Sequence, residues 1–118
     1  MRLVMLTLLM LISSCVAHGT RPVCESSPLI MRASWYNMGT ITASGKPFNP
    51  SALTTAHPSL PFGTKLRLTN PHNQRTVIVT VTDRGPFVKN RELDVSEAAA
   101  RQLGFLRRGV ILLEVCIL

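Results

Sequence analysis

The stretch TKLRLTNPHNQRTVIVTVTD, residues 64–83, decides the fold. Its first part alternates leucines with polar residues, and its last part places three valines at every second position. A period of two residues is typical of a strand with one buried face. The run NPHNQ in the middle is rich in residues that form turns. The stretch therefore predicts an antiparallel hairpin whose strands are residues 64–70 and 75–83.

Three further segments complete the predicted architecture. The run LIMRASWYN, residues 29–37, reads as a first strand, and GVILLEVCIL, residues 109–118, reads as a buried closing strand. The run LDVSEAAARQLGF, residues 93–105, predicts one short helix, with Asp94 or Ser96 as its N-cap and a glycine as its left-handed stop. Several strands and one helix, without an internal repeat, favour a small closed barrel over an open sheet with exposed edges.

The start of the chain predicts export. Residues 1–14 carry one positive charge and an apolar run too short to span a bilayer, as in a secretory signal peptide. The aliphatic residue and two small residues before Cys15 resemble a bacterial lipobox, in which that cysteine is lipidated and becomes the mature N-terminus. The alternative is an ordinary signal peptide cleaved near Ala17. On the first interpretation residues 15–28 form a tether and residues 29–118 the folded domain.

Charge and compartment limit the partners. The formal net charge is +7 at pH 7, and an exported basic domain is attracted to anionic lipids or acidic wall polymers. The alternative is a generally positive, solvated surface. We expect a monomer in the periplasm, anchored by lipid to a membrane, with the outer membrane as the expected one. Export argues against nucleic acid as a partner, and the scattered His and Cys residues match no metal-binding pattern.

Two cysteines follow Cys15, one near each end of the expected mature chain. In an oxidising compartment Cys24 and Cys116 are a candidate disulfide that joins the terminal segments. The alternative is that Cys116, inside an apolar run, is a buried small hydrophobic residue. The sequence alone leaves both interpretations open.

Three segments of the chain resemble the rare lipoprotein A family. They are ASWYN at residues 33–37, the run from TASGKPF to LRLTN at residues 42–70, and the run from VTDRGPF to RQLGF at residues 81–105. The resemblance implies a six-stranded double-psi β-barrel. It also implies a lytic transglycosylase that needs no cofactor and cleaves peptidoglycan, with a preference for glycan strands that lack stem peptides.

A lytic transglycosylase needs a single well-placed carboxyl group. The 6-hydroxyl of the muramyl sugar attacks its own anomeric carbon, so one carboxyl group first protonates the leaving oxygen and then accepts the hydroxyl proton. Asp83 and Asp94 are the candidates, because each ends an apolar stretch and related barrels carry two aspartates at this spacing. Alternatively, Asp83 organises a turn and Asp94 caps the helix. Which aspartate donates the proton is not decided by sequence.

A set of further residues is expected around the acids, one from the resemblance and the others from their side-chain chemistry. His57 matches a histidine of the family's active groove, although a histidine before a proline is also an ordinary loop residue. Arg84 is expected to contact substrate oxygens or to pair with Asp83. Aromatic stacking on sugars is expected of Trp35 and Tyr36, with core packing as the alternative. Further contacts to sugar are expected from Lys46, Asn49, Thr54 and Thr55.

Two of these positions depart from the family pattern. Lys46 and Asn49 stand where many relatives have a glutamate and an aspartate, and neither replacement acts as a carboxylate. If those acids are essential, the protein binds glycan without cutting it. A noncatalytic, expansin-like wall-binding module is therefore the alternative function.

Overall fold

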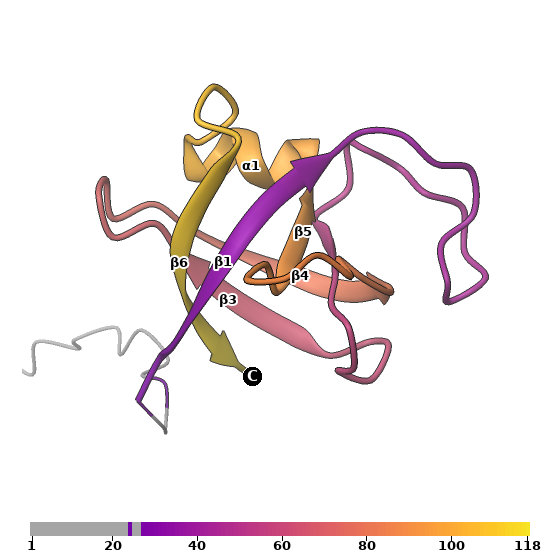
Figure 1. Ribbon diagram of the computed structural model, residues 1–118, viewed down its shortest axis with the longest axis horizontal. Helices are drawn as coiled ribbons and strands as arrows, with labels where there is room; N and C mark the ends of the chain where they lie inside the picture. Colours follow the sequence, from indigo (N-terminus) through magenta and orange to yellow (C-terminus); the bar gives the residue numbers. More distant parts are fainter. Residues whose placement is uncertain (1–23, 25–26) are drawn as a thin grey trace, which may run out of the picture.

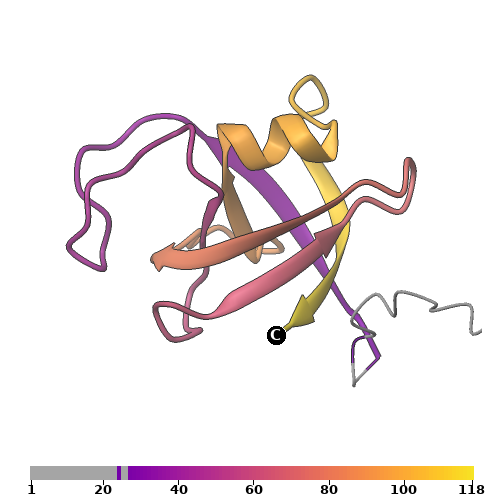
Figure 2. The ribbon, with the colours of Figure 1, turned by 180° about the vertical axis from the view of Figure 1, so that it is seen from behind.

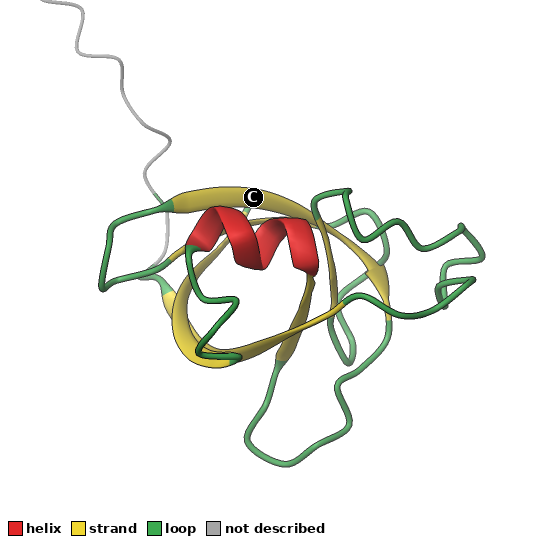
Figure 3. Ribbon diagram, turned by 90° about the horizontal axis from the view of Figure 1, so that it is seen from above, coloured by secondary structure: helices red, strands yellow, loops and turns green. Residues whose placement is uncertain are grey.

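The computed structural model describes Cys24 and residues 27–118 as a closed barrel of six strands with one helix. The elements are β1 (Leu29–Tyr36), β2 (Thr54–Ala56), β3 (Lys65–Thr69), β4 (Thr76–Asp83), β5 (Leu93–Ser96), α1 (Glu97–Leu103) and β6 (Val110–Ile117). The strand order around the barrel is β1-β5-β2-β4-β3-β6. Helix α1 lies across one end of the barrel (Figures 1 and 3). The predicted six-stranded barrel with one short helix is confirmed.

The predicted hairpin forms the back of the barrel. Strands β3 and β4 pair antiparallel, with Leu66 opposite Val79 and Leu68 opposite Val77, and they run side by side in Figure 2. All four side chains are buried in the core. Each such burial contributes about 1.5–3 kcal/mol. Because the leucines and valines meet in register, the two-residue period of the sequence becomes one wall of the core.

The short strands β2 and β5 have no counterpart in the sequence prediction. Strand β5 pairs parallel with β1, strand β2 pairs parallel with β4, and the two pair antiparallel with each other. They close the barrel between the first strand and the hairpin. With three and four residues they are too short to display a hydrophobic period, so only their neighbours define them as strands.

Helix α1 begins at Ser96 and ends at Gly104. The Ser96 hydroxyl accepts a hydrogen bond from the backbone N–H of Ala99 at 3.3 Å. Gly104 adopts the left-handed conformation, with φ 79°, as the sequence predicts. The N-cap is thus Ser96, and the interpretation of Asp94 as the cap is wrong. Asp94 lies within strand β5, two residues before the cap.

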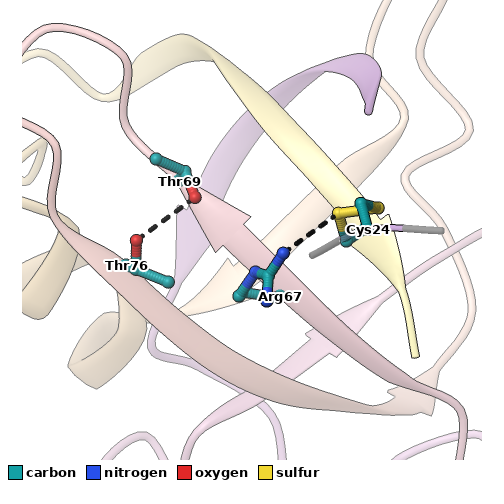
Figure 4. The surroundings of a disulfide bond; sticks show 5 residues. Cys24, Arg67, Thr69 and Thr76 are labelled. Atoms are coloured by element: carbon teal, nitrogen blue, oxygen red, sulfur yellow. Dashed lines mark hydrogen bonds between the residues drawn. A yellow bond between two sulfur atoms is a disulfide. The ribbon is translucent and has the colours of Figure 1, made fainter. Parts of the chain in front are cut away.

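A disulfide joins Cys24 to Cys116 of β6, so the first of the two predictions for this pair is confirmed. The Cα atoms are 5.6 Å apart, a normal separation for a disulfide. The Arg67 guanidinium donates a hydrogen bond to the Cys116 sulfur at 3.5 Å (Figure 4). Cys15, the predicted lipidation site, lies outside the described residues. In the described part of the chain, no helix combines the length and apolar character needed to cross a membrane.

Candidate active site

The two aspartates flank a single alanine on three adjacent strands. Ala56 of β2 pairs with Asp94 of β5 on one side and with Asp83 of β4 on the other. Residues that pair directly face the same side of a sheet. Neighbouring strands lie about 4.8 Å apart, so the two aspartate backbones are separated by about 10 Å. The barrel therefore brings both candidate acids to one site on its outer face.

A β-bulge in β4 turns Asp83 outward. Val77, Val79 and Val81 face the core, and strict alternation would send the side chain of residue 83 there as well. The pairing instead steps from Thr55 opposite Val81 to Ala56 opposite Asp83, which skips Thr82. A bulge of this kind re-aims the side chains that follow it. Asp83 consequently points to the same side as Asp94.

Three donors hold the Asp83 carboxylate in place. The backbone N–H groups of Ala43 and Arg84 donate to Oδ1 at 2.8 and 2.9 Å. The Tyr36 hydroxyl donates to Oδ2 at 3.2 Å. The Tyr36 ring stacks on Phe48, with ring centroids 4.5 Å apart and planes 15° from parallel. Burial and the adjacent aspartates raise the pKa of Tyr36, so its hydroxyl stays protonated and remains a donor.

Asp94 is partly buried and accepts fewer hydrogen bonds than Asp83. Its Oδ1 accepts a hydrogen bond from the Ser34 hydroxyl at 2.8 Å. Burial raises the pKa of Asp94, and the negative charge of Asp83 adds to this effect, whereas the Ser34 hydrogen bond and the Arg91 charge oppose it. A carboxyl group with a raised pKa retains its proton closer to neutral pH, which a general acid requires.

His57 directly follows β2. Its backbone N–H donates a hydrogen bond to the backbone carbonyl oxygen of Asp83 at 3.2 Å. Its Nδ1 accepts hydrogen bonds from the backbone N–H groups of Ser59 and Leu60 at 3.1 and 3.0 Å. These bonds assign the proton of the neutral ring to Nε2. Burial and the nearby Arg84 lower the pKa of His57, with Glu92 opposing. His57 is thus a neutral Nε2–H donor at physiological pH.

The Arg84 side chain stabilises the loop that begins at His57. Its Nη1 donates to the carbonyl oxygens of Leu60 at 2.8 Å and His57 at 3.4 Å. Its guanidinium carbon lies 3.9 Å from the centroid of the Phe62 ring, a cation–π contact. Among the described residues Arg84 forms no ion pair with Asp83. Of the two interpretations of Arg84, the pairing with Asp83 is wrong, because the side chain holds the loop and not the acid.

Three of the predicted sugar contacts lie in or against the core. Trp35 donates its indole N–H to the Leu106 carbonyl at 3.1 Å and packs on the core cluster, which is the alternative interpretation of that residue. Thr55 is completely buried, with its hydroxyl bonded to backbone oxygens. The hydroxyl of Thr54 is also shielded from solvent. None of the three side chains offers a polar group to a saccharide in this conformation.

Lys46 and Asn49 lie on the long loop between β1 and β2, which projects from one side of the barrel in Figure 1. Both residues are exposed. The Asn49 side-chain oxygen accepts a hydrogen bond from the Ser51 N–H at 2.9 Å, so it shapes the loop locally. The same loop supplies the Ala43 N–H to Asp83. The loop is therefore part of the site, although no described contact joins Lys46 or Asn49 to the acids.

Two residues of the site were missed by the sequence prediction. Ser34 is the hydrogen-bond donor to Asp94, and its position two residues before Tyr36 on a predicted strand places both on one face. Phe87 is 83% exposed on the loop after Asp83. The Phe87 ring rests against Gly85, since its edge lies 3.6 Å from the position that a Cβ would take there. It leaves an open aromatic surface on the loop that follows Asp83.

A family model described as lytic transglycolase matches residues 30–115. A probable endolytic peptidoglycan transglycosylase RlpA from Nostoc sp. is 54% identical over 72 residues, which cover 61% of this chain and 19% of that protein. Its namesake from Aquifex aeolicus is 52% identical over 89 residues, which cover 73% and 39%. The chain thus spans less than half the length of these relatives. The apo structure of a Clavibacter michiganensis expansin is 28% identical, with a TM-score of 0.63 over 77% of this chain and 50% of the expansin.

Proposed function

The chain belongs to the lytic transglycolase family, as its motifs predict, and on that premise we propose that its barrel cleaves the glycan strands of peptidoglycan by transglycosylation. The observation that carries this proposal is the pair Asp83 and Asp94 on either side of Ala56. Their environments differ, because one carboxyl group accepts three hydrogen bonds and the other is desolvated with a raised pKa. Two carboxyl groups in unlike environments are suited to two different roles.

Asp94 is the proton carrier in this proposal. Its carboxyl group donates a proton to the glycosidic oxygen as the bond from the anomeric carbon to that oxygen breaks. The 6-hydroxyl oxygen of the same muramyl sugar then bonds to the anomeric carbon, and its proton passes to the Asp94 carboxylate. The reaction leaves a 1,6-anhydro end, and the carboxyl group returns to its protonated form. No water or second acid is consumed.

Asp83 stabilises the charge that develops between these steps. The anomeric carbon becomes oxocarbenium-like in glycoside cleavage, and a fixed carboxylate nearby favours that positive charge. The two backbone donors and the Tyr36 hydroxyl keep the carboxylate from turning toward Asp94. His57 offers its Nε2–H to a sugar oxygen on the Asp83 side, and the exposed Phe87 ring offers a surface for stacking on a sugar face.

The second candidate function is glycan binding without cleavage. Lys46 and Asn49 stand where many relatives have acids, and an expansin shares the fold with a TM-score of 0.63. The first function is favoured because the matching family model is described as lytic transglycolase and relatives that are 54% and 52% identical are named for the same activity, whereas the expansin is only 28% identical.

Digestion of purified glycan strands without stem peptides tests the choice. We expect wild type to release products with 1,6-anhydro ends, and Asp94→Asn to release them about 10²–10⁴ times more slowly, which is the usual contribution of a general acid. Asp83→Asn should also be slow. Strand binding should survive in both variants, since each retains the site's shape. Strand binding without any anhydro product from wild type would select the noncatalytic function.

We also propose that the chain is exported and anchored through a lipid on Cys15. The predicted lipobox supports this, and so does the Cys24–Cys116 disulfide, because such bonds persist in oxidising compartments. Metabolic labelling with a fatty-acid analogue tests it. Labelled wild type and unlabelled Cys15→Ser are expected, whereas equal labelling of both would contradict the anchor.

A further inference from the structure

A basic pocket lies on the outer face of the barrel beside the candidate active site. It has a volume of about 220 Å³ and is lined by Arg32, His72, Arg108, Val110, Ile111 and Leu112. The lining residues come from β1, the turn after β3, and the start of β6 with the loop before it. They include two arginines and no acid. The pocket is therefore suited to a small anionic group.

The two guanidinium groups are available to a ligand. Within the described part of the chain, neither the Arg32 nor the Arg108 side chain makes a hydrogen bond or an ion pair. Glu92 is the acid near Arg32, and its Oε2 accepts the Arg32 backbone N–H at 2.7 Å rather than the side chain. Each guanidinium presents five N–H donors in a planar fork, which matches the two oxygens of a carboxylate.

The pocket continues the active site along strand β1. Arg32 and Ser34 are two residues apart on that strand, so they face the same side and their backbones are separated by about 7 Å. Arg32 pairs with Leu112 of the pocket, and Ser34 pairs with Asp94 of the active site. The row of outward-facing residues that reaches Asp94 through Ser34 thus continues to Arg32, where the pocket begins.

We propose that Arg32 and Arg108 bind a carboxylate carried by the glycan strand that occupies the active site. This inference rests on the proposed function. A muramyl sugar without a stem peptide has a free, negatively charged lactyl carboxylate, whereas in a sugar with a stem peptide that group is an uncharged amide. The pocket distinguishes the two, because only the free carboxylate pairs with the guanidinium forks. It thus selects strands by the charge of a muramyl sugar bound beside the acids.

Binding is measured on the full chain with Asp94→Asn as background, so that the strands stay intact. The ligand is peptide-free glycan, followed by isothermal titration calorimetry. We expect Arg32→Gln and Arg108→Gln each to weaken binding about tenfold, the loss typical of one hydrogen bond to a charged group. Arg107→Gln is the matched control, since it removes the same charge from an exposed neighbour outside the pocket. It should bind like the background protein.

Glycan whose lactyl carboxylates have been converted to methyl amides provides the second arm. The background protein should bind this glycan as weakly as the Arg32→Gln variant binds the native glycan, and Arg32→Gln should cause no further loss. Equal binding of both glycans by the background protein would overturn the proposal, as would an equal loss from Arg107→Gln. Near-UV circular dichroism checks that each variant is folded.

Vesicles of phosphatidylglycerol test the rival source of anionic groups. If Arg32→Gln and Arg108→Gln lose vesicle binding but keep glycan binding, the pocket serves a lipid surface and the proposal fails. All of these readouts are binding measurements. They are separate from the release of anhydro products by the wild-type chain, so a failure of the pocket and a failure of the catalytic proposal are distinguishable.

Discussion

Loss of the Cys24–Cys116 disulfide is expected to lower the stability of the barrel by several kcal/mol. The bond joins residues 92 apart in sequence, so nearly the whole barrel lies inside the loop that it closes. In the chain-entropy account, a cross-link over about 92 residues removes about 16 cal/mol/K from the unfolded chain, or about 4.6 kcal/mol at 25 °C. Removal of native disulfides from small domains typically costs about 2–5 kcal/mol. We therefore expect a loss of about 2–4.6 kcal/mol for the double variant Cys24→Ser/Cys116→Ser.

Urea unfolding followed by tryptophan fluorescence measures this loss. Trp35 is the only tryptophan of the chain, and it packs on the core with its indole bonded to the Leu106 carbonyl, so its emission reports the barrel. For this measurement the chain is produced without residues 1–14 and oxidised in vitro, so that Cys15 carries no lipid. Cys15→Ser is then the matched control, because it makes the same chemical change outside the loop. A reductant should destabilise wild type and the control but leave the double variant unchanged. A loss below about 1 kcal/mol would refute the entropic argument.

Three further predictions follow from the site. The pKa of Asp94 is higher in the folded protein than in the unfolded chain, where it is about 3.9, so the fold favours the protonated carboxyl group. The resulting stability is fully present below the pKa of the unfolded chain and is lost as the pH rises through the pKa of the folded protein. Asp94→Asn should therefore be more stable than wild type at pH 7 and lose this advantage at pH 3, as read from urea midpoints. Tyr36→Phe, which removes one donor from Asp83, should cost about 1 kcal/mol and slow cleavage without weakening strand binding; an unchanged cleavage rate would contradict its role. Arg84→Gln should speed amide hydrogen exchange in the loop after His57, and unchanged exchange would show that the loop needs no such anchor.

The hairpin and the helix were predictable because each has a strong local signal. The alternation of leucines and valines in residues 64–83 requires one buried face, and a serine N-cap with a closing glycine marks the helix ends. Strands β2 and β5 lack such a signal. Thr54 and Thr55 looked like surface hydroxyls because threonine is polar, but the pairing of β2 between β4 and β5 turns Thr55 into the core.

The different positions of Trp35 and Tyr36, one in the core and one at the site, could have been predicted from the sequence. Trp35 and Tyr36 are consecutive in a predicted strand, and consecutive strand residues face opposite sides. They therefore cannot both stack on a bound sugar. The structure places Trp35 against the core and Tyr36 at Asp83. The same alternation assigns Ser34 to the face of Tyr36, where it bonds to Asp94.

The direction of Asp83 was beyond any local rule, because it depends on a register shift between two strands that are far apart in sequence. Under strict alternation the carboxylate would follow Val81 into the core, where an unpaired charge is too costly to bury. The bulge at Thr82 avoids that cost, and it also brings the carboxylate within reach of the Ala43 N–H and the Tyr36 hydroxyl. Because Thr82 is skipped in the pairing, the end of a strand that otherwise faces the core presents its carboxylate at the site. The proposed chemistry of the barrel depends on this irregularity as much as on the identity of its acids.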